Sequence, residues 1–429
     1  MSLHQESRPR GRLIMRDRLK AQLAGSRDEL IALCSALGRN DSQNPPGDTS
    51  GMAGTCRAAL AGVAGIRVET LVNNAPKVNL VATLTGAHPG PRLVLNGHLD
   101  TGPVADLDRW TVPPFGGVVE TDRIYGRGIA DMKAGLAADV LAMRTLAQFR
   151  DDLHGELVLM LVADEGTGGR DGTQFVLSSR PELAGDAMLS GDVGSPRVAR
   201  IGEKGFVWIE IEATGKSAAG AHPHLGANAI LHLVPALQAI QSLSEAPVSI
   251  PDTMRRAIEK AAPLSERLNG AGETHTLTHN TVNIGLIQGG IRINSVPSRA
   301  SARVDIRMPP GSSVEAVTTQ IAELLDSIPH IAWRVIDLAE PNWTMPEERI
   351  VSLLAGNAAE VLGQDIGVSI RPGFSDSRFF RLQQVPAVVY GVTPQNGNAP
   401  DEHVLIADLE AVYRVHALTA FDFLSPPAR

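Results

Sequence analysis

Two periodicities of apolar residues alternate along the chain and predict an α/β fold. Short apolar runs indicate buried strands, and apolar residues three or four positions apart indicate amphipathic helices. We expect strands at 68–72, 78–84, 93–97, 157–163 and 187–189. We expect helices at 16–38, 55–65, 132–149 and 171–179. Because strands and helices alternate, the first half of the chain is predicted to form one sheet covered by helices.

The pattern changes at residue 205. Residues 206–214 alternate apolar and polar positions with period two, as a half-exposed antiparallel strand does. A helix at 227–243, a polar loop at 244–279 and strands at 281–287 and 301–307 follow. We interpret 205–312 as an inserted second domain, flanked by a catalytic domain made of 1–204 and 313–429. The later elements, at 313–326, 331–337, 347–362, 366–370, 386–390 and 407–424, are expected to complete the first sheet.

Composition and charge narrow the class of protein. The 429 residues are 43% hydrophobic and 20% charged, which is typical of a water-soluble globular protein, and no apolar run has membrane-spanning length. A net charge of −8 without a basic block argues against a nucleic-acid partner. The charged N-terminus lacks a signal-peptide pattern, and Cys34 and Cys56 suggest reduced thiols, so we expect a cytoplasmic protein.

Polar residues follow the predicted strands and form a candidate site. His98 and Asp100 follow the strand at 93–97, and Glu165 and Asp192 follow two later strands. Asp131 lies at the start of the helix at 132–149. Taken singly, the His-x-Asp pair is compatible with a polar strand end, and Asp131 with a helix N-cap. Together, one imidazole and four carboxylates at the carboxyl ends of strands favour a metal site.

Five motifs occur together in the order and context of one enzyme family. They are GHLDT at 97–101, GRGIADMKAG at 126–135, ADEGTGG at 163–169, the acid at 192 and NAPDEHV at 398–404. On these motifs the chain resembles the metal-dependent aminoacylase–carboxypeptidase family, which includes acetylornithine deacetylase and succinyl-diaminopimelate desuccinylase. The resemblance implies an α/β catalytic domain, with a mixed sheet flanked by helices around a two-metal site. It also implies an inserted α+β dimerisation domain.

The resemblance assigns a role to each residue of the candidate site. His98 and Asp192 match terminal ligands of one metal, and Asp131 matches the carboxylate that bridges two metals. Asp100 matches the acid that orients His98, and Glu165 matches the general base. The chemistry is consistent, because a divalent ion lowers the pKa of a bound water and a nearby carboxylate can accept its proton.

The resemblance also suggests substrate contacts and a homodimer. Asn294, Arg292, Arg307 and Arg378 fall where family members hold the substrate's carboxylate, although each arginine is also compatible with a surface salt bridge. We expect a small carboxylated substrate. The strand at 206–214 and the helix after Asn228 are expected to supply the edge and face of an isologous dimer contact.

Three positions depart from the family pattern. Gly166 follows Glu165 where the family has a glutamate ligand of the second metal, and Asn398 replaces that metal's histidine. His403 is out of register and is interpreted as structural. Both losses affect the same metal, so we expect one divalent ion per chain: manganese, zinc or cobalt.

The third departure is Ala219, at the position of a histidine that stabilises an oxyanion in the partner's active site. His222 and His224 flank Pro223 and are alternatives, but a surface His-Pro-His is the favoured interpretation. A change introduced by engineering would give the same sequence at Ala219.

These departures favour a C–N hydrolase that does not depend on an oxyanion at a carbonyl. We therefore expect an aromatic aminohydrolase, such as the family member that deaminates 5-nitroanthranilate. The alternatives are a one-metal hydrolase of N-acyl or N-carbamoyl amino acids or dipeptides, and an inactive relative that binds a small molecule. Retention of Glu165, whose role is chemical, argues against the inactive relative.

Overall fold

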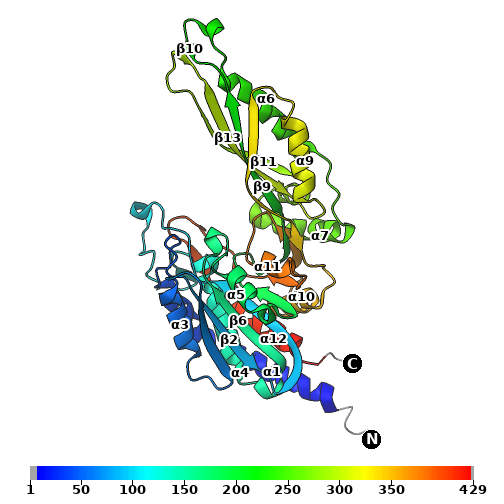
Figure 1. Ribbon diagram of the computed structural model, residues 1–429. Helices are drawn as coiled ribbons and strands as arrows, with labels where there is room; N and C mark the ends of the chain where they lie inside the picture. Colours follow the sequence, from blue (N-terminus) through cyan, green and yellow to red (C-terminus); the bar gives the residue numbers. More distant parts are fainter. Residues whose placement is uncertain (1–6, 427–429) are drawn as a thin grey trace. The chain divides into compact units, whose positions relative to one another are not determined.

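The computed structural model describes residues 7–426 and divides the chain into two compact units (Figure 1). Unit 1 comprises the described residues of Met1–Ile201, Thr344–Val368 and Ser375–Arg429. Unit 2 comprises Gly202–Trp343 and Ser369–Phe374. Unit 2 is therefore an insertion in the sequence of unit 1, and each unit has its own sheet and core.

The largest sheet is mixed and has nine strands. Its order is β1 (Ile66–Val72), β2 (Val78–Thr85), β6 (His154–Val162), β3 (His88–His98), β7 (Ala187–Ser190), β17 (Ala387–Val389), β8 (Val198–Glu203) and β15 (Asn342–Trp343), with β16 (Gly367–Arg371) also paired to β8. The central strands β6, β3, β7 and β17 are parallel neighbours, and the outer pairings β1–β2, β2–β6 and β8–β15 are antiparallel. The predicted mixed sheet is confirmed.

Helices flank this sheet, as predicted (Figure 1). They are α1 (Ser7–Gly25), α2 (Arg27–Gly38), α3 (Ser50–Leu60), α4 (Ala134–Ala147), α5 (Thr173–Ser179), α10 (Arg349–Leu362), α11 (Ser377–Arg381) and α12 (Ile406–Phe423). Helix α4 is apolar on nearly every side because it packs against α2, α12 and strands β3 and β6. Unit 1 also contains a small three-stranded sheet of β18 (His403–Leu405), β5 (Arg123–Tyr125) and β4 (Val118–Val119).

Unit 2 contains a four-stranded antiparallel sheet with helices packed on it. The strand order is β11 (Thr281–Gly289), β13 (Arg299–Met308), β9 (Gly205–Thr214) and β14 (Ile331–Ala339). Helices α6 (Ala229–Gln241) and α9 (Val314–Leu325) bury their apolar faces on this sheet, and β10 (Ala218–Ala219) pairs with β12 (Ser295–Val296). Residues such as Ile209, Leu233 and Ile321 form the core.

Three expectations about unit 2 were wrong. The inserted unit extends to Trp343 rather than 312, because β14 pairs with β9 and α9 packs on the same sheet. The predicted loop at 244–279 contains α7 (Asp252–Asn269) and α8 (Glu273–Thr278); in α7, Met254, Ile258 and Ala261 are buried at helical spacing. Strand β9 is central, paired on both sides, so it is not the edge expected to form a dimer contact.

No helix within residues 7–426 has the length and apolar character needed to cross a membrane.

Candidate active site

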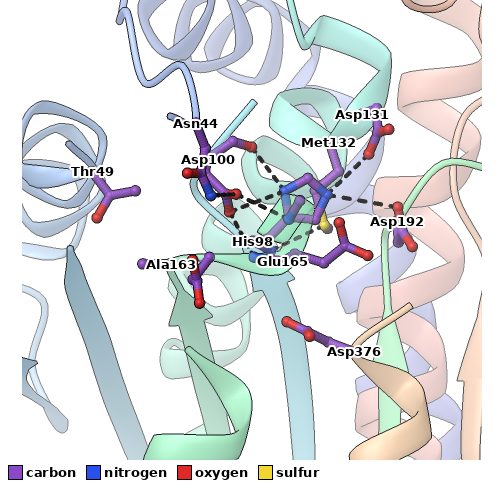
Figure 2. A network of polar contacts seen from close by, with 12 residues as sticks. Asn44, Thr49, His98, Asp100, Asp131, Met132, Ala163, Glu165, Asp192 and Asp376 are labelled. Atoms are coloured by element: carbon purple, nitrogen blue, oxygen red, sulfur yellow. Dashed lines mark hydrogen bonds and ion pairs between the residues drawn. The ribbon is translucent and has the colours of Figure 1, made fainter. Parts of the chain in front are cut away.

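Three ligand-type side chains converge at the carboxyl ends of the parallel strands. His98 is the last residue of β3, Asp192 follows β7, and Asp131 lies in the turn before α4. His98 Nε2 lies 2.9 Å from Asp131 Oδ1 and 3.9 Å from Asp192 Oδ1 (Figure 2). One ligand atom from each of the three residues lies within 4.8 Å of the other two. The structure thus brings together the three predicted ligands.

The donor set fits a divalent metal ion. His98 Nδ1 lies 2.9 Å from the carbonyl oxygen of Asp100, so Nδ1 carries the proton and Nε2 faces the two carboxylates. Zinc ligands lie about 2.0–2.2 Å from the ion, so small side-chain shifts would let these three atoms share one. Burial alone would lower the pKa of His98, but hydrogen bonds to Asp131 and Asp192 raise it well above its ordinary value. The same negative field favours a bound cation.

Asp100 acts differently from the prediction. We expected its carboxylate to orient His98, but its backbone carbonyl does so, and the carboxylate Oδ1 is 3.7 Å from His98 Nδ1. The carboxylate instead accepts hydrogen bonds from the backbone N–H groups of Glu165 and Gly166, each at a distance of 3.1 Å. It also accepts one from the side-chain amide of Asn44 at 2.8 Å. Asp100 lies beyond the end of β3, where it can reach the neighbouring turn. It therefore fixes the segment that carries Glu165.

Glu165 begins a short 3-10 turn, and two residues separate it from the end of β6. Asp164, in the left-handed conformation with φ 74°, reverses the chain there. Figure 2 shows the partly buried Glu165 side chain near His98 and Asp192. Burial raises the pKa of Glu165 well above its ordinary value; His98 opposes this, while Asp376 and Asp192 add to it. A carboxylate with a raised pKa suits proton transfer near neutral pH.

Asp376, which the sequence did not suggest, lies near Glu165 (Figure 2). Its side chain is buried, and Oδ2 accepts the Thr173 hydroxyl over 2.9 Å. Burial raises the pKa of Asp376 to about 6, although Arg378 opposes the shift. Asp376 therefore adds negative charge near Glu165.

A buried ion pair organises the turn that carries Asp131. The Glu402 carboxylate accepts hydrogen bonds from the backbone N–H groups of Gly128 and Ala130, each at 3.1 Å. It also accepts one from Arg127 Nη1 at 2.8 Å. Arg127 Nη2 also donates to Asn398 Oδ1 over 2.8 Å. The guanidinium thus contacts the position where the resemblance places a histidine ligand of the second metal.

The positions tied to a second metal offer few ligands. Gly166 has no side chain, and His403 lies in β18 with Nδ1 2.9 Å from the Asp401 carbonyl. Across residues 7–426, the trio of His98, Asp131 and Asp192 is the one group of three such side chains close enough to share an ion.

The predicted substrate-binding residues belong to different units. Arg378, in unit 1, is buried and donates to the carbonyls of Ser375 and Gly168 over 3.0 and 2.9 Å. In unit 2, Arg307 pairs with Asp305 over 3.1 Å. Arg292 and Asn294, also in unit 2, are exposed.

Ala219 lies exposed in β10, and the rings of His222 and His224 are exposed nearby in the sequence. The rings stand 5.9 Å apart, centre to centre. Their exposure agrees with the interpretation of a surface His-Pro-His.

Comparison with known proteins identifies the family. Residues 94–422 match the family described as peptidase family M20/M25/M40. The chain belongs to this family. It is 28% identical over 346 residues to a succinyl-diaminopimelate desuccinylase from Rhodospirillum centenum, covering 78% of this chain and 82% of the relative. Members of the M20 family are metal-dependent hydrolases of C–N bonds, and the chain is an enzyme of this class.

Solved structures share the M20 fold. An M20 metallo-carboxypeptidase from Sulfolobus solfataricus has a TM-score of 0.74 at 19% identity, covering 92% of this chain and 99% of that one. A Bacillus subtilis protein described as a dinuclear metal-binding M20 peptidase has a TM-score of 0.66 at 15% identity, covering 94% and 99%. Both likenesses confirm the fold of the M20 chain.

The sequence did not indicate roles for Arg127, Asn44 and Asp376, nor for Glu402 beyond its place in the NAPDEHV motif. Arg127 lies within the GRGIADMKAG motif, four residues before Asp131, and that proximity was a usable signal. Asn44 and Asp376 lie in loops without any spacing relationship to the other site residues.

Proposed function

We propose that this M20 enzyme hydrolyses a C–N bond in a small carboxylated substrate with one divalent metal ion. His98, Asp131 and Asp192 would hold the ion, and Glu165 would act as general base. The observation that carries the proposal is the convergence of one imidazole and two carboxylates within 4.8 Å, next to a carboxylate with a raised pKa.

Two observations support a single ion. Gly166 supplies no ligand, and Asn398, a neutral and weaker ligand than histidine, already accepts a hydrogen bond from Arg127. A guanidinium and a metal ion are both cations, so the presence of Arg127 disfavours a second ion at Asn398. Imidazole and carboxylate ligands suit manganese, zinc or cobalt.

The chain's own groups would orient and move the proton. A bound divalent ion supplies Lewis acidity and lowers the pKa of a water molecule. A carboxylate oxygen of Glu165 would accept the proton of that water and later deliver it to the departing nitrogen. Asp100 holds the backbone of Glu165 during these steps, because it accepts the Glu165 N–H over 3.1 Å.

For the substrate, we propose an electron-poor aromatic amine that carries a carboxylate, as in 5-nitroanthranilate. Water oxygen would bond to the ring carbon, the C–N bond would break, and the amino group would leave as ammonia with the proton taken by Glu165. The negative charge would spread into the ring, so this reaction does not need the oxyanion histidine that Ala219 replaces. Arg292 and Asn294, which the resemblance assigns to the substrate's carboxylate, are both exposed in unit 2.

A second candidate is hydrolysis of an N-acyl or N-carbamoyl amino acid or a dipeptide. It is favoured by the similarity to a succinyl-diaminopimelate desuccinylase over 78% of the chain. The remaining alternative is an inactive relative that binds a carboxylated molecule. The position of Glu165 near His98 and Asp192, with a raised pKa, argues against it.

One assay separates these functions. The metal-loaded protein is incubated with aminobenzoates, acylated amino acids and dipeptides, and release of ammonia is measured against release of amino acids. Ammonia from an aminobenzoate supports the proposal, and amino-acid release supports the second candidate. Binding without turnover of any compound would contradict both, and Glu165→Gln serves as the control for contaminating activity.

We further propose that unit 2 forms a homodimer. Strand β11 is an edge of its sheet, and Leu286 and Ile287 on it are 53% and 59% exposed. Ile291 and Ile293, in the following loop, are also exposed. An apolar edge strand is prone to pair with another chain. Sedimentation should give a dimer at micromolar concentration, and Ile287→Asp should weaken it; a monomeric wild-type protein would contradict this.

The proposed location is the cytoplasm, because Cys34 and Cys56 are both buried free thiols.

A further inference from the structure

A fully buried pair of ionisable residues joins helices α4 and α12. Asp139 on α4 and His416 on α12 are both 0% exposed, and Asp139 Oδ1 lies 2.5 Å from His416 Nδ1. His416 Nε2 lies 2.8 Å from the carbonyl oxygen of Tyr390. A carbonyl only accepts, so Nε2 carries a hydrogen, and one further proton is shared between Nδ1 and Asp139. The pair is therefore neutral overall, and its two hydrogen bonds fix the orientation of the His416 ring.

This pair connects three segments near the proposed ligands Asp131 and Asp192. They are α4, the turn that contains Asp192, and the segment at Tyr390. Helix α4 begins just after Asp131, and Asp139 lies on it. Burial raises the pKa of Asp139, while His416 and, to a smaller extent, the Gly191 amide next to Asp192 lower it. Tyr390, which His416 contacts, donates its N–H to the carbonyl of Ser190 over 2.8 Å.

The backbones of these segments are in direct contact. A Cβ on Gly135 would lie 2.1 Å from the Gly191 oxygen, and a Cβ on Gly391 would lie 2.0 Å from the Asp192 oxygen. Gly135 and Asp139 are four residues apart, so they share the face of α4 that meets Gly191. The absence of side chains at Gly135 and Gly391 allows this close approach, and the hydrogen bonds of the buried pair join the same segments.

We propose that Asp139 and His416 are positioning residues that set the placement of Asp192 relative to Asp131, and hence the affinity of the site for its metal. The proposal rests on the proposed metal site. A purely structural pair would be costly to bury and replaceable by apolar side chains, often without loss of stability. Apolar replacement of a pair that positions ligands should preserve stability but lower metal affinity, because groups that orient metal ligands typically contribute about 10–100-fold to that affinity.

The test measures Zn²⁺ affinity by competition with a chromophoric chelator, together with melting temperature, on the full-length protein. The variants are Asp139→Asn, His416→Gln and the apolar double variant Asp139→Leu/His416→Leu. The control is Tyr413→Phe, which removes the buried 2.8 Å contact between Thr145 Oγ1 and Tyr413 Oη on the same two helices, farther along α4 from Asp131.

We expect all three variants to bind Zn²⁺ about 10–100-fold more weakly than the wild type, while Tyr413→Phe changes affinity less than threefold. The double variant should keep a melting temperature near that of the wild type. Unchanged Zn²⁺ affinity in the folded variants would overturn the proposal, and so would failure of all three to fold, since the pair would then serve folding. If the wild type and His98→Ala bind Zn²⁺ equally, the proposed metal site itself is wrong.

Discussion

The guanidinium of Arg127 donates a hydrogen bond to the side-chain oxygen of Asn398 over 2.8 Å. The same guanidinium pairs with buried Glu402, which caps the turn before Asp131. A fixed cation thus contacts the position that, by resemblance, would serve a second metal in two-metal relatives. This contact is the main structural argument for one ion per chain.

Restoring both missing ligands should restore the second ion. In the double variant Gly166→Glu/Asn398→His, a carboxylate and an imidazole become available together. A Cβ on Gly166 would meet only Asp100 Oδ2, at 3.3 Å, a tight contact that a shift of a few tenths of an ångström in that side chain relieves. We expect two ions per chain in the double variant and one in each single variant, measured by elemental analysis after dialysis. One ion in the double variant would show that these two positions do not decide the stoichiometry.

Replacing Glu165 with glutamine should separate catalysis from binding. Glutamine keeps the size and hydrogen bonding of Glu165 but accepts no proton, so turnover should fall about 10²–10⁴-fold. Metal content and substrate binding should persist. If Glu165 is instead a metal ligand, metal content will fall with turnover. If Glu165 only caps its turn, stability will drop by about 1 kcal/mol and turnover will hardly change.

Arg127→Met should destabilise the protein, because it leaves the Glu402 carboxylate buried without its cation. The side chains of Arg127 and Glu402 are 5% and 1% exposed, and breaking such a pair costs about 3 kcal/mol of unfolding free energy. Arg123→Met, which breaks a largely exposed pair with Asp122, is the control and should cost less than about 1 kcal/mol. Equal losses in urea unfolding would contradict this account of the buried pair.

Acid should weaken the contact between α1 and α10. Arg16, and with it Lys20, lowers the pKa of Glu360 to about 2, although partial burial opposes the shift. Because the folded-state pKa is below the unfolded value of about 4.3, the stabilisation is complete above that pH and is lost as pH falls toward 2. Glu360 is 40% exposed, so solvent screening limits the effect to about 0.5–1 kcal/mol.

Glu360→Gln provides the comparison for this pH dependence. The difference in unfolding free energy between wild type and variant should be greatest at pH 6 and should shrink between pH 4 and 2. A difference that is constant over this range would assign the effect of the substitution to something other than charge.

Much of the site could be predicted because strand ends are visible in the sequence. Apolar runs located β3, β6 and β7, so His98, Glu165 and Asp192 were expected at the same edge of the sheet. The role of Asp100 could not be predicted in full, because its contact with His98 runs through a backbone carbonyl. Side-chain chemistry in the sequence carries no information about such contacts.

The boundary of unit 2 and the buried pair show a different limit. The periodicity of α9 and β14 was recognised, but periodicity does not tell which sheet an element joins, and β14 pairs with β9. Likewise, Asp139 and His416 are 277 residues apart, so only the packing of α4 on α12 brings them together.

The most direct test of the account is the metal stoichiometry of the wild-type protein. Elemental analysis and titration of the metal-free protein with Mn²⁺ and Zn²⁺ should give one tightly bound ion per chain. His98→Ala and Asp192→Ala should each abolish that binding while the protein remains folded. Two tightly bound ions per chain, or one ion that survives the loss of His98, would contradict the single-metal site formed by His98, Asp131 and Asp192.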